Sequence, residues 1–207
     1  MIKLEFKVDI SEYKSENEAY NKYEFDVLDV NDEYGTPGYG TSVLVGKGKA
    51  ILYLVEKKYM DYYTGDGMED SFCANCHEEF YDELFDSETG SLRDEYLDLM
   101  VNSGSENILV PDRLEILPEY RNKGIGRKIT EMIRNFFAGC YGIEIIKAFP
   151  LQLEGRTPSG LDEDWRKKML YDKMEQNADK ATSSLYRMYE KKGYTRVLGT
   201  EFFYYLP

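Results

Sequence analysis

Apolar and polar residues alternate near the start of the chain, where charged side chains separate Leu4, Phe6 and Val8. The same two-residue period returns around Tyr23 and Phe25, and it is typical of strands with one buried face. Farther along, apolar residues recur at strand or helix spacing. The spacing predicts strands at residues 107–117, 143–149, 194–198 and 202–206, and helices at residues 124–138, 162–176 and 181–191.

Two glycines interrupt an apolar stretch at residues 41–56. Gly46-Lys47-Gly48 separates two strand-like runs, residues 41–45 and 49–56. A short glycine-bearing connection between such runs is typical of a β-hairpin, so we expect a hairpin here.

Residues 61–98 are far more acidic than the rest of the chain, with 13 Asp and Glu against one basic residue, Arg93. Two sets of apolar residues within them recur at helical spacing, which predicts two amphipathic helices. The sets are Phe72, Cys76, Phe80 and Leu84, and then Leu92, Tyr96, Leu99 and Met100. We expect these acidic helices to form an insertion at residues 61–102.

The chain of 207 residues, 42% of them hydrophobic, fits one globular domain spanning residues 1–207. The order of its elements favours an α+β fold with a mixed, mostly antiparallel central sheet flanked by helices. No apolar run approaches the ~20 residues of a membrane-spanning helix, and the first ten residues lack a signal-peptide pattern. Three cysteines are too few for a disulfide framework. We therefore expect a cytoplasmic protein without a membrane partner.

The formal net charge of −13 is divided unevenly along the chain. Residues 1–107 carry 25 acidic and 9 basic residues, a net charge of −16, whereas residues 108–207 carry 14 and 17, a net charge of +3. An acidic surface repels nucleic acid and attracts cations, so we expect no nucleic-acid partner. The second half, by contrast, can accept an anion.

A candidate anion site lies where the predicted strand 107–117 runs into Pro118 and the next helix begins. Gly124 and Gly126 allow the backbone to approach a ligand closely, and the first turn of a helix presents unpaired N–H groups at the positive end of its dipole. Such a turn can bind phosphate. Basic side chains add mobile positive charge at the same place: Arg121, Lys123, Arg127 and Lys128.

This segment resembles the coenzyme A-binding motif of the GNAT superfamily of N-acetyltransferases, in which a strand and a proline precede an Arg/Gln-x-x-Gly-x-Gly/Ala loop. The matching residues are Ile116, Pro118 and the run Arg121, Asn122, Lys123, Gly124, Ile125 and Gly126. Residues 188–194, Met-Tyr-Glu-Lys-Lys-Gly-Tyr, are similar to the family's Phe-Tyr-Glu-Lys-Leu-Gly-Phe segment. The resemblance covers residues 107–150 and 180–206, and it implies the acyl-CoA N-acyltransferase fold.

The resemblance also implies acetyl-CoA as co-substrate and a set of residues that bind it. The backbone of Leu114, Glu115 and Ile116 would pair with the pantetheine arm as a strand does. Backbone N–H groups from residue 122 to Arg127 would hold the pyrophosphate. Thr182 stands where the family often has an asparagine that touches the cofactor, so this contact is altered or lost.

Two catalytic residues are expected for direct transfer to an amine. Tyr189 stands where many members of the family place the general acid for the departing thiolate, and a phenol with a pKa of ~10 suits a thiol with a pKa of ~8.5. Asp112 precedes Leu114 and Ile116 on one strand and should share their face, which makes it a candidate general base. The competing interpretation is a strand-end carboxylate in solvent. Glu115 should point the other way.

Cys73-Ala74-Asn75-Cys76-His77 spells a haem-attachment pattern and could also be half of a zinc site. Haem attachment requires an oxidising compartment, and His77 is the only histidine in the chain. We therefore expect no metal, and interpret the segment as a helix with one buried cysteine.

The sequence thus predicts an N-acetyltransferase that moves an acetyl group from acetyl-CoA directly to a primary amine. The acidic segment favours a cationic acceptor, such as a polyamine, an aminoglycoside, or a lysine or amino terminus of a basic protein. The alternative is a non-catalytic protein of the same fold whose acidic half docks on a basic partner or mimics nucleic acid. Binding of acetyl-CoA distinguishes the two.

Overall fold

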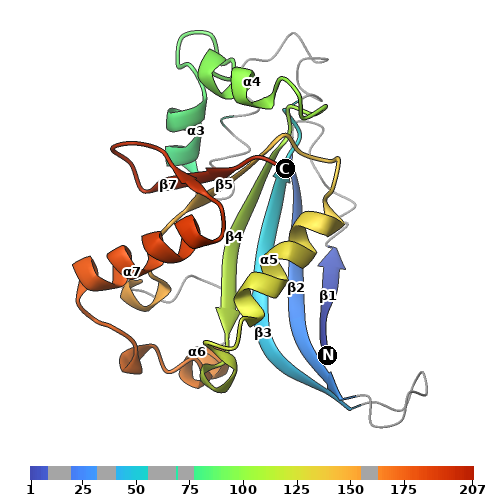
Figure 1. The fold of residues 1–207 in the computed structure, drawn as a ribbon, viewed down its shortest axis with the longest axis vertical. Coiled ribbons are helices and arrows are strands. Elements are labelled where there is room, and N and C mark those ends of the chain that lie inside the picture. Colours follow the sequence, from blue (N-terminus) through green and yellow to red (C-terminus); the bar gives the residue numbers. More distant parts are fainter. Residues whose placement is uncertain (9–19, 32–40, 56–68, 70–76, 155–162) are drawn as a thin grey trace.

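The computed structural model of the chain describes residues 1–8, 20–31, 41–55, 69, 77–154 and 163–207. Its described strands form a seven-stranded sheet in the order β1-β2-β3-β4-β5-β7-β6 (Figure 1). Neighbouring strands are antiparallel except β4 and β5, which are parallel. The strands are β1 (Ile2–Val8), β2 (Tyr20–Asn31), β3 (Thr41–Tyr53), β4 (Ile108–Ile116), β5 (Ile143–Lys147), β6 (Thr195–Arg196) and β7 (Phe202–Tyr205). The expected α+β class with a mostly antiparallel sheet is confirmed.

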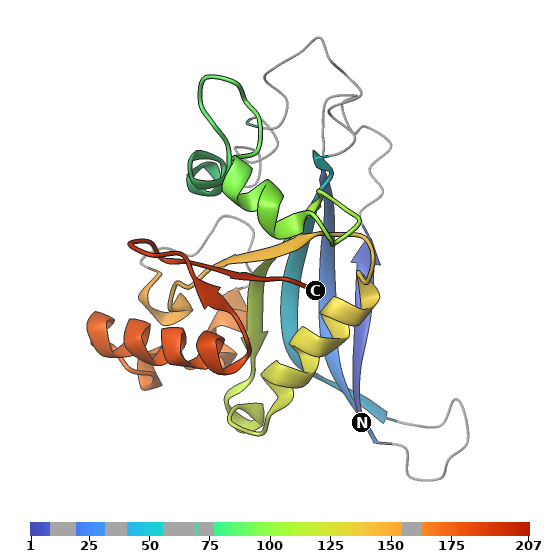
Figure 2. The same ribbon diagram turned by 45° about the horizontal axis from the view of Figure 1, so that its top comes forward.

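Helices lie on both sides of this sheet (Figure 2). The α-helices are α3 (Glu78–Leu84), α4 (Asp94–Met100), α5 (Ile125–Phe136), α6 (Glu163–Lys168) and α7 (Ala178–Lys191), and the short 3-10 helices are η1 (Pro118–Tyr120), η2 (Leu151–Leu153) and η3 (Tyr171–Lys173).

The two faces of the sheet can be followed along β3, because alternate side chains of a strand point to opposite sides. Ala50 and Leu52 pack with Ile129 and Ile133 of α5, which defines the α5 face. Ile51 and its neighbour on the same side, Tyr53, pack with residues of α3 and α4, which defines the α3 face.

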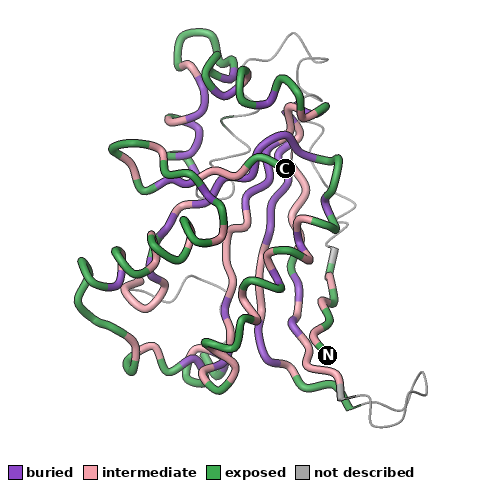
Figure 3. The backbone as a smooth tube through the Cα atoms, viewed as in Figure 1, coloured by how far each residue is buried: buried purple, intermediate pink, exposed green. Residues whose placement is uncertain are grey.

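The remaining helices follow the same division. In β5, Ile145 belongs to the cluster on the α3 face, whereas Ile146 packs beside Tyr189 of α7, so α7 lies on the α5 face. Trp165 of α6 donates a hydrogen bond to Glu115 of β4, on the α3 face, at 3.2 Å. The central strands are therefore covered on both sides, and Figure 3 shows their residues as the most buried part of the chain.

The expected hairpin at residues 41–56 is wrong, because β3 is a single strand of 13 residues that pairs with β2 on one side and β4 on the other. Its glycines serve close packing instead of a turn. A Cβ at Gly48 would lie 2.2 Å from Cζ of Phe25, and a Cβ at Gly46 would lie 3.2 Å from Cβ of Val27. Glycine inside a strand often marks such a close approach.

The charged helix expected at residues 162–176 is shorter and broken. α6 ends at Lys168, and Leu170 adopts a left-handed conformation with φ of 47° before η3 begins. A left-handed residue cannot continue a right-handed helix, so the chain turns here. The turn places Tyr171 against β4.

The described part of the acidic segment contains α3 and α4. Phe80, Leu84, Tyr96 and Met100 are buried on the α3 face, as the helical spacing predicts, but Leu99 is 36% exposed. Phe72 and Cys76 lie outside the described residues. No helix within the described ranges is long and apolar enough to cross a membrane.

Candidate functional site

β4 and β5 begin side by side and then separate. They pair at Ile108 with Ile143 and at Leu109 with Glu144, whereas β4 continues to Ile116 (Figure 1). Beyond these pairs, no described strand lies against β4 on its β5 side. The second half of β4 therefore pairs with β3 on one side only, and the backbone edge on its other side is not paired with a described strand.

The edge of β4 that faces away from β3 is formed by the backbone of Leu114 and Ile116, and the Ile116 carbonyl on it accepts a hydrogen bond from Arg121 Nε at 2.8 Å. The Glu115 carbonyl faces β3, since its oxygen would lie 2.6 Å from a Cβ on Gly46, and the Leu117 N–H donates to β3 at 2.9 Å. Backbone groups alternate along a strand, so those of Leu114 and Ile116 face away from β3. The resemblance implies that the backbone of Leu114, Glu115 and Ile116 pairs with pantetheine. The backbone of Leu114 and Ile116 faces the open side, whereas that of Glu115 faces β3.

The chain after β4 forms a tight connection into α5. Asn122 and Gly124 both adopt left-handed conformations, with φ of 59° and 76°, and Gly124 caps the first turn of the helix. The first-turn N–H groups of α5 have no partner within the helix, and no side chain in the described part of the chain caps them. This is the predicted anion-binding turn, and Lys123, Ile125 and Arg127 lie within it as expected.

Gly126 is not required by the protein's own packing. It is helical, and a Cβ there would make only an ordinary contact, 3.5 Å from Cδ1 of Ile116. Glycine in a helix costs about 0.5–1 kcal/mol relative to alanine. A residue that lowers stability without an internal reason suggests a ligand that passes close to the backbone.

Only some of the basic side chains at this turn are free to meet an anion. Arg121 is not one of them: its Nε donates to the Ile116 carbonyl at 2.8 Å and its Nη2 to the Met169 carbonyl at 2.6 Å. It ties the end of β4 to the chain after α6, and the expectation that it adds mobile positive charge is wrong. Arg127 pairs with Glu131, and Lys128 is exposed.

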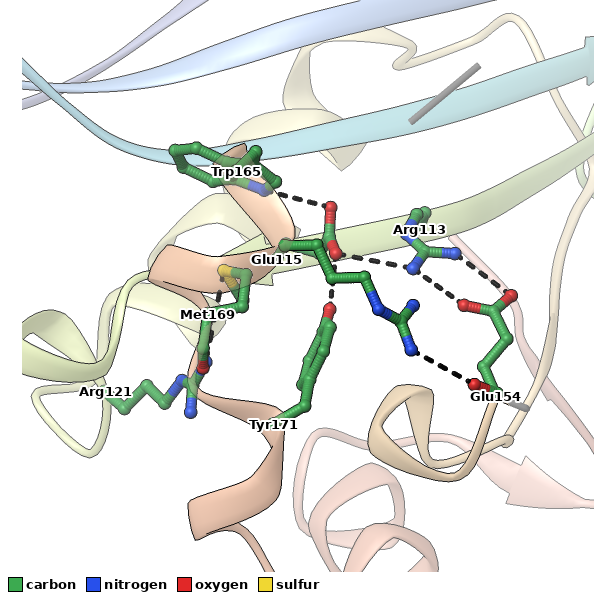
Figure 4. A network of polar contacts seen from close by, with 8 residues as sticks. Arg113, Glu115, Arg121, Glu154, Trp165, Met169 and Tyr171 are labelled. Atoms are coloured by element: carbon green, nitrogen blue, oxygen red, sulfur yellow. Dashed lines mark hydrogen bonds and ion pairs between the residues drawn. The ribbon is translucent and has the colours of Figure 1, made fainter. Parts of the chain in front are cut away.

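A buried polar network fixes the end of β4 from the α3 face (Figure 4). The Glu115 side chain is 4% exposed and accepts hydrogen bonds from the Tyr171 hydroxyl, the Trp165 indole at 3.2 Å and Arg113 at 3.3 Å. Arg113 also makes a bidentate pair with Glu154, at 2.9 and 3.3 Å. Glu115 points away from Leu114, as expected, but its donors Trp165 and Tyr171 lie 50 and 56 residues farther along the chain and carry no local sequence signal.

Asp112 does not share the face of Leu114 and Ile116. The strand pairing shifts at this point, because Lys49 pairs with Arg113 while the next residue of β3 pairs with Pro111, so Asp112 is an extra residue in a bulge. A bulge reverses the side-chain alternation that the prediction assumed. The Asp112 carboxylate consequently lies on the α3 face, with Lys49.

On that face, Asp112 belongs to a chain of polar contacts. Its Oδ2 accepts from Lys49 Nζ at 2.7 Å, its Oδ1 contacts His77 Nε2 at 2.7 Å, and His77 Nδ1 contacts the Tyr53 hydroxyl at 2.9 Å. Burial alone would raise the pKa of Asp112, but the hydrogen bond and charge of His77, together with Lys49, lower it to about 2. Asp112 is therefore an ionised carboxylate and a weak base.

Tyr189 lies beside the part of β5 that no longer pairs with β4. Its ring packs 5.3 Å from that of Tyr194 and 5.8 Å from that of Phe203, measured between centroids. Burial, followed by the charge of Glu144, raises the pKa of Tyr189 to about 12. The phenol therefore keeps its proton near neutral pH, as a proton donor must. Thr182, one of the expected cofactor contacts, is half-buried on the same helix.

The Cys73-x-x-Cys76-His77 motif can be followed only at His77, because both cysteines lie outside the described residues. His77 is buried and is occupied by Tyr53 and Asp112. Among the described residues, no three His, Cys, Asp or Glu side chains are grouped so that they could hold a metal ion.

Comparison with known proteins adds no assignment: the chain matches no family model, no curated protein and no solved structure. The geometry of the site is therefore the basis on which its function can be argued.

Proposed function

We propose that this protein is an N-acyltransferase that transfers an acetyl group from acetyl-CoA to a primary amine. The observation that carries the proposal is the open edge of β4, formed by the backbone of Leu114 and the N–H of Ile116, combined with the uncapped first turn of α5. The first offers hydrogen bonds to an amide-containing arm, and the second offers N–H groups to a phosphate. Coenzyme A joins both groups in one molecule, because its amide-containing pantetheine arm is attached to a pyrophosphate.

The residues at the turn fit a pyrophosphate. The left-handed Gly124 directs the backbone into the helix, and Gly126, which has no side chain, would let a pyrophosphate approach the backbone of the first turn. Lys123 and Lys128 are exposed and can approach the phosphates. Arg121 contributes by holding the Ile116 carbonyl and the chain after α6, so that the strand end and the turn keep their relative positions.

Tyr189 supports the transfer half of the proposal. It lies on the α5 face, the side of the sheet that carries the anion-binding turn, and it retains its proton. When acetyl-CoA is bound, it supplies the activated acetyl group and a thiol leaving group. Tyr189 is the group of this chain proposed to give a proton to that thiol.

The acceptor amine is proposed to enter from the opposite, α3 face. Asp112 and Lys49 lie there, 24% and 23% exposed, between α3 and α6. The pairing of Asp112 with Lys49 and His77 makes it better suited to orient an acceptor than to remove its proton, so Asp112 is proposed as an orienting group.

Gly126 provides the decisive experiment. Gly126→Ala adds a Cβ that the protein tolerates, so we expect thermal stability to stay equal or rise by up to about 1 kcal/mol. The same Cβ would stand against the pyrophosphate, so acetyl-CoA affinity measured by calorimetry should fall by about tenfold or more, equivalent to about 1.4 kcal/mol.

A charge-matched pair of variants completes the test. Gly126→Glu should abolish binding, whereas Asn135→Glu adds the same charge at an exposed position near the other end of α5 and should bind normally. If the wild-type protein binds no acetyl-CoA at millimolar concentration, the non-catalytic alternative replaces the proposal. If Gly126→Ala and Gly126→Glu bind as well as the wild type, the turn is not the phosphate site.

A further inference from the structure

A wholly buried carboxylate lies at the point where β4 and β5 separate. Glu144 of β5 is 0% exposed, accepts a hydrogen bond from Arg134 Nε at 2.7 Å and another from the Tyr194 hydroxyl. The Arg134 guanidinium lies against two aromatic rings, 3.3 Å from the Tyr205 centroid and 4.8 Å from that of Tyr194. Glu144 and Arg134 thus form a buried ion pair, in which Arg134 Nη2 has no hydrogen-bond partner among the described residues.

A second cation, Lys192, lies beside this pair without a carboxylate of its own among the described ion pairs. Its Nζ donates to Thr130 Oγ1 at 3.3 Å and lies 5.8 Å from the centroid of the Tyr189 ring. Burial lowers the pKa of Lys192, and the charge of Arg134 lowers it further, while Glu144 opposes both effects. The cluster therefore holds two cations and one carboxylate.

Lys192 is half-buried, and an extra cation partly removed from water is unfavourable unless something compensates it. The family segment that residues 188–194 resemble has leucine at the position of Lys192 and phenylalanine at that of Tyr194. An apolar side chain would fill this position without desolvating a charge. The resemblance therefore does not explain Lys192. The excess positive charge that Lys192 brings to the cluster would be compensated by an anion that is present only during the reaction.

The position of Lys192 indicates which anion that is. Its acceptor, Thr130 Oγ1, donates in turn to the Gly126 carbonyl at 2.9 Å. The hydroxyl of Thr130 therefore links the Lys192 ammonium to the proposed pyrophosphate turn. On its other side is Tyr189, the proposed donor to the leaving thiol. Lys192 thus lies between the turn that would hold the coenzyme and the group that would protonate its sulfur.

We infer that Lys192 is a charge-balancing residue whose ammonium stabilises the negative charge that develops on the departing coenzyme A sulfur beside Tyr189. The inference rests on the proposed function. In that step the acceptor nitrogen bonds to the acetyl carbon, and the carbon–sulfur bond breaks with its electron pair going to sulfur. The Tyr189 hydroxyl proton passes to sulfur. The acceptor amine releases its proton to solvent, and the phenolate of Tyr189 regains one from solvent.

The inference can be tested without knowing the acceptor, by comparing free coenzyme A with acetyl-CoA. Only free coenzyme A has a thiol, with an ordinary pKa of ~8.5. If Lys192 stabilises its thiolate by one pKa unit, the ratio of coenzyme A to acetyl-CoA affinity rises about sixfold between about pH 7 and pH 9. Calorimetry measures both affinities on the same protein.

Three variants separate the charge from the packing. Lys192→Met keeps the length of the side chain and should remove the rise in the affinity ratio, whereas Lys192→Arg should retain it. Lys191→Met makes the same substitution at the exposed neighbouring residue and should behave as the wild type. The other groups facing Lys192 are Arg134 from α5, Glu144 from β5, Tyr194, Tyr205 from β7 and Tyr189, and all are unchanged in these variants.

The outcomes distinguish the inference from the proposal beneath it. If the wild type binds neither coenzyme, the proposed function fails. If it binds both and the affinity ratio does not change with pH, or changes equally in Lys192→Met and Lys191→Met, coenzyme binding stands and the role of Lys192 is wrong. A rise that is lost only in Lys192→Met and kept in Lys192→Arg supports the inference.

Discussion

At the scale of single residues, Asp112 and Glu115 show how neighbouring carboxylates on one strand differ in environment. Glu115 is buried and has three donors, from Tyr171, Trp165 and Arg113. Asp112 remains partly exposed and pairs with Lys49 and His77 on the same face. Glu115 therefore holds the end of β4 in place, while Asp112 can still meet a ligand.

The pairing of Asp112 predicts a pH-dependent contribution to stability. Its pKa is about 2 in the folded protein against 3.8 ordinarily, so the folded state favours the ionised form by about 2 kcal/mol. This contribution is fully present above the unfolded pKa and is lost as the pH falls from about 4 to about 2. Asp112→Asn should lower stability by about this amount near pH 7, measured by urea unfolding.

The difference between Asp112→Asn and the wild type should shrink as the pH approaches 2. Asp172→Asn, at a position 69% exposed, should show no such difference at any pH. A gap between Asp112→Asn and the wild type that stays constant from pH 7 to about pH 2.5 would mean that packing, and not charge, accounts for the loss.

At the scale of elements, β3 and the strand–turn–helix unit from β4 to α5 use glycine for different reasons. Gly48 lies in the middle of β3, with the Phe25 ring where a side chain would be. Gly126 lies in the first turn of α5 with ordinary space around it. Packing inside the protein requires the first glycine, whereas the second is explained by the proposed ligand.

This contrast predicts opposite effects of the same substitution. At Gly48 an alanine Cβ would lie 2.2 Å from the Phe25 ring and 2.9 Å from the Arg113 carbonyl oxygen. Gly48→Ala should therefore destabilise the protein by about 1–3 kcal/mol, as overpacking does, whereas Gly126→Ala should not. Urea denaturation of both variants measures the difference.

A double-mutant cycle identifies the cause of the loss at Gly48. Phe25→Leu removes the ring, so the combined variant Gly48→Ala with Phe25→Leu should be more stable than the sum of the two single losses, by about 1 kcal/mol. Additive losses would assign the cost to the Arg113 carbonyl or to strand pairing instead.

At the scale of the whole molecule, charge is divided between two parts that serve different ligands in the proposal. Residues 61–98 hold 13 carboxylates and one arginine, and the described helices among them, α3 and α4, pack on the face where Asp112 lies. The turn proposed to bind the coenzyme's phosphates lies on the opposite face. A cationic acceptor and an anionic coenzyme would then approach from opposite sides of the sheet.

The charge division predicts how transfer depends on salt. A cationic acceptor attracted by the acidic segment should lose specificity constant as ionic strength rises, because salt screens such a field over ~10 Å at 0.1 M. Acetyl-CoA binding depends on local contacts and should change less. Kinetics with polyamines, aminoglycosides and basic peptides at low and high salt measure both effects. A best acceptor that is neutral or acidic, with no salt dependence, would contradict the preference for cations.

Local patterns in the sequence determined most of the elements, because the spacing of apolar residues indicates both the type of element and its buried face. The turn after β4 could also be predicted, because Pro118 fixes its own φ and Gly124 readily adopts the positive φ found there. Long-range geometry decided the rest. The bulge that moves Asp112 to the α3 face arises from pairing with β3, and the sequence of β4 alone does not predict it.

The tertiary structure also decided what the glycines of β3, Arg121 and Lys192 do. Gly46-Lys47-Gly48 has the composition of a turn, and only the approach of Phe25 and β4 makes it a strand. Arg121 belongs to a basic cluster in sequence, yet two carbonyls brought together by the fold occupy it. The environment of Lys192 is set by the charge of Glu144 and the hydroxyl of Thr130, which lie 48 and 62 residues away along the chain. Sequence specifies such residues, but folding selects their partners, because desolvation and charge depend on neighbours in space.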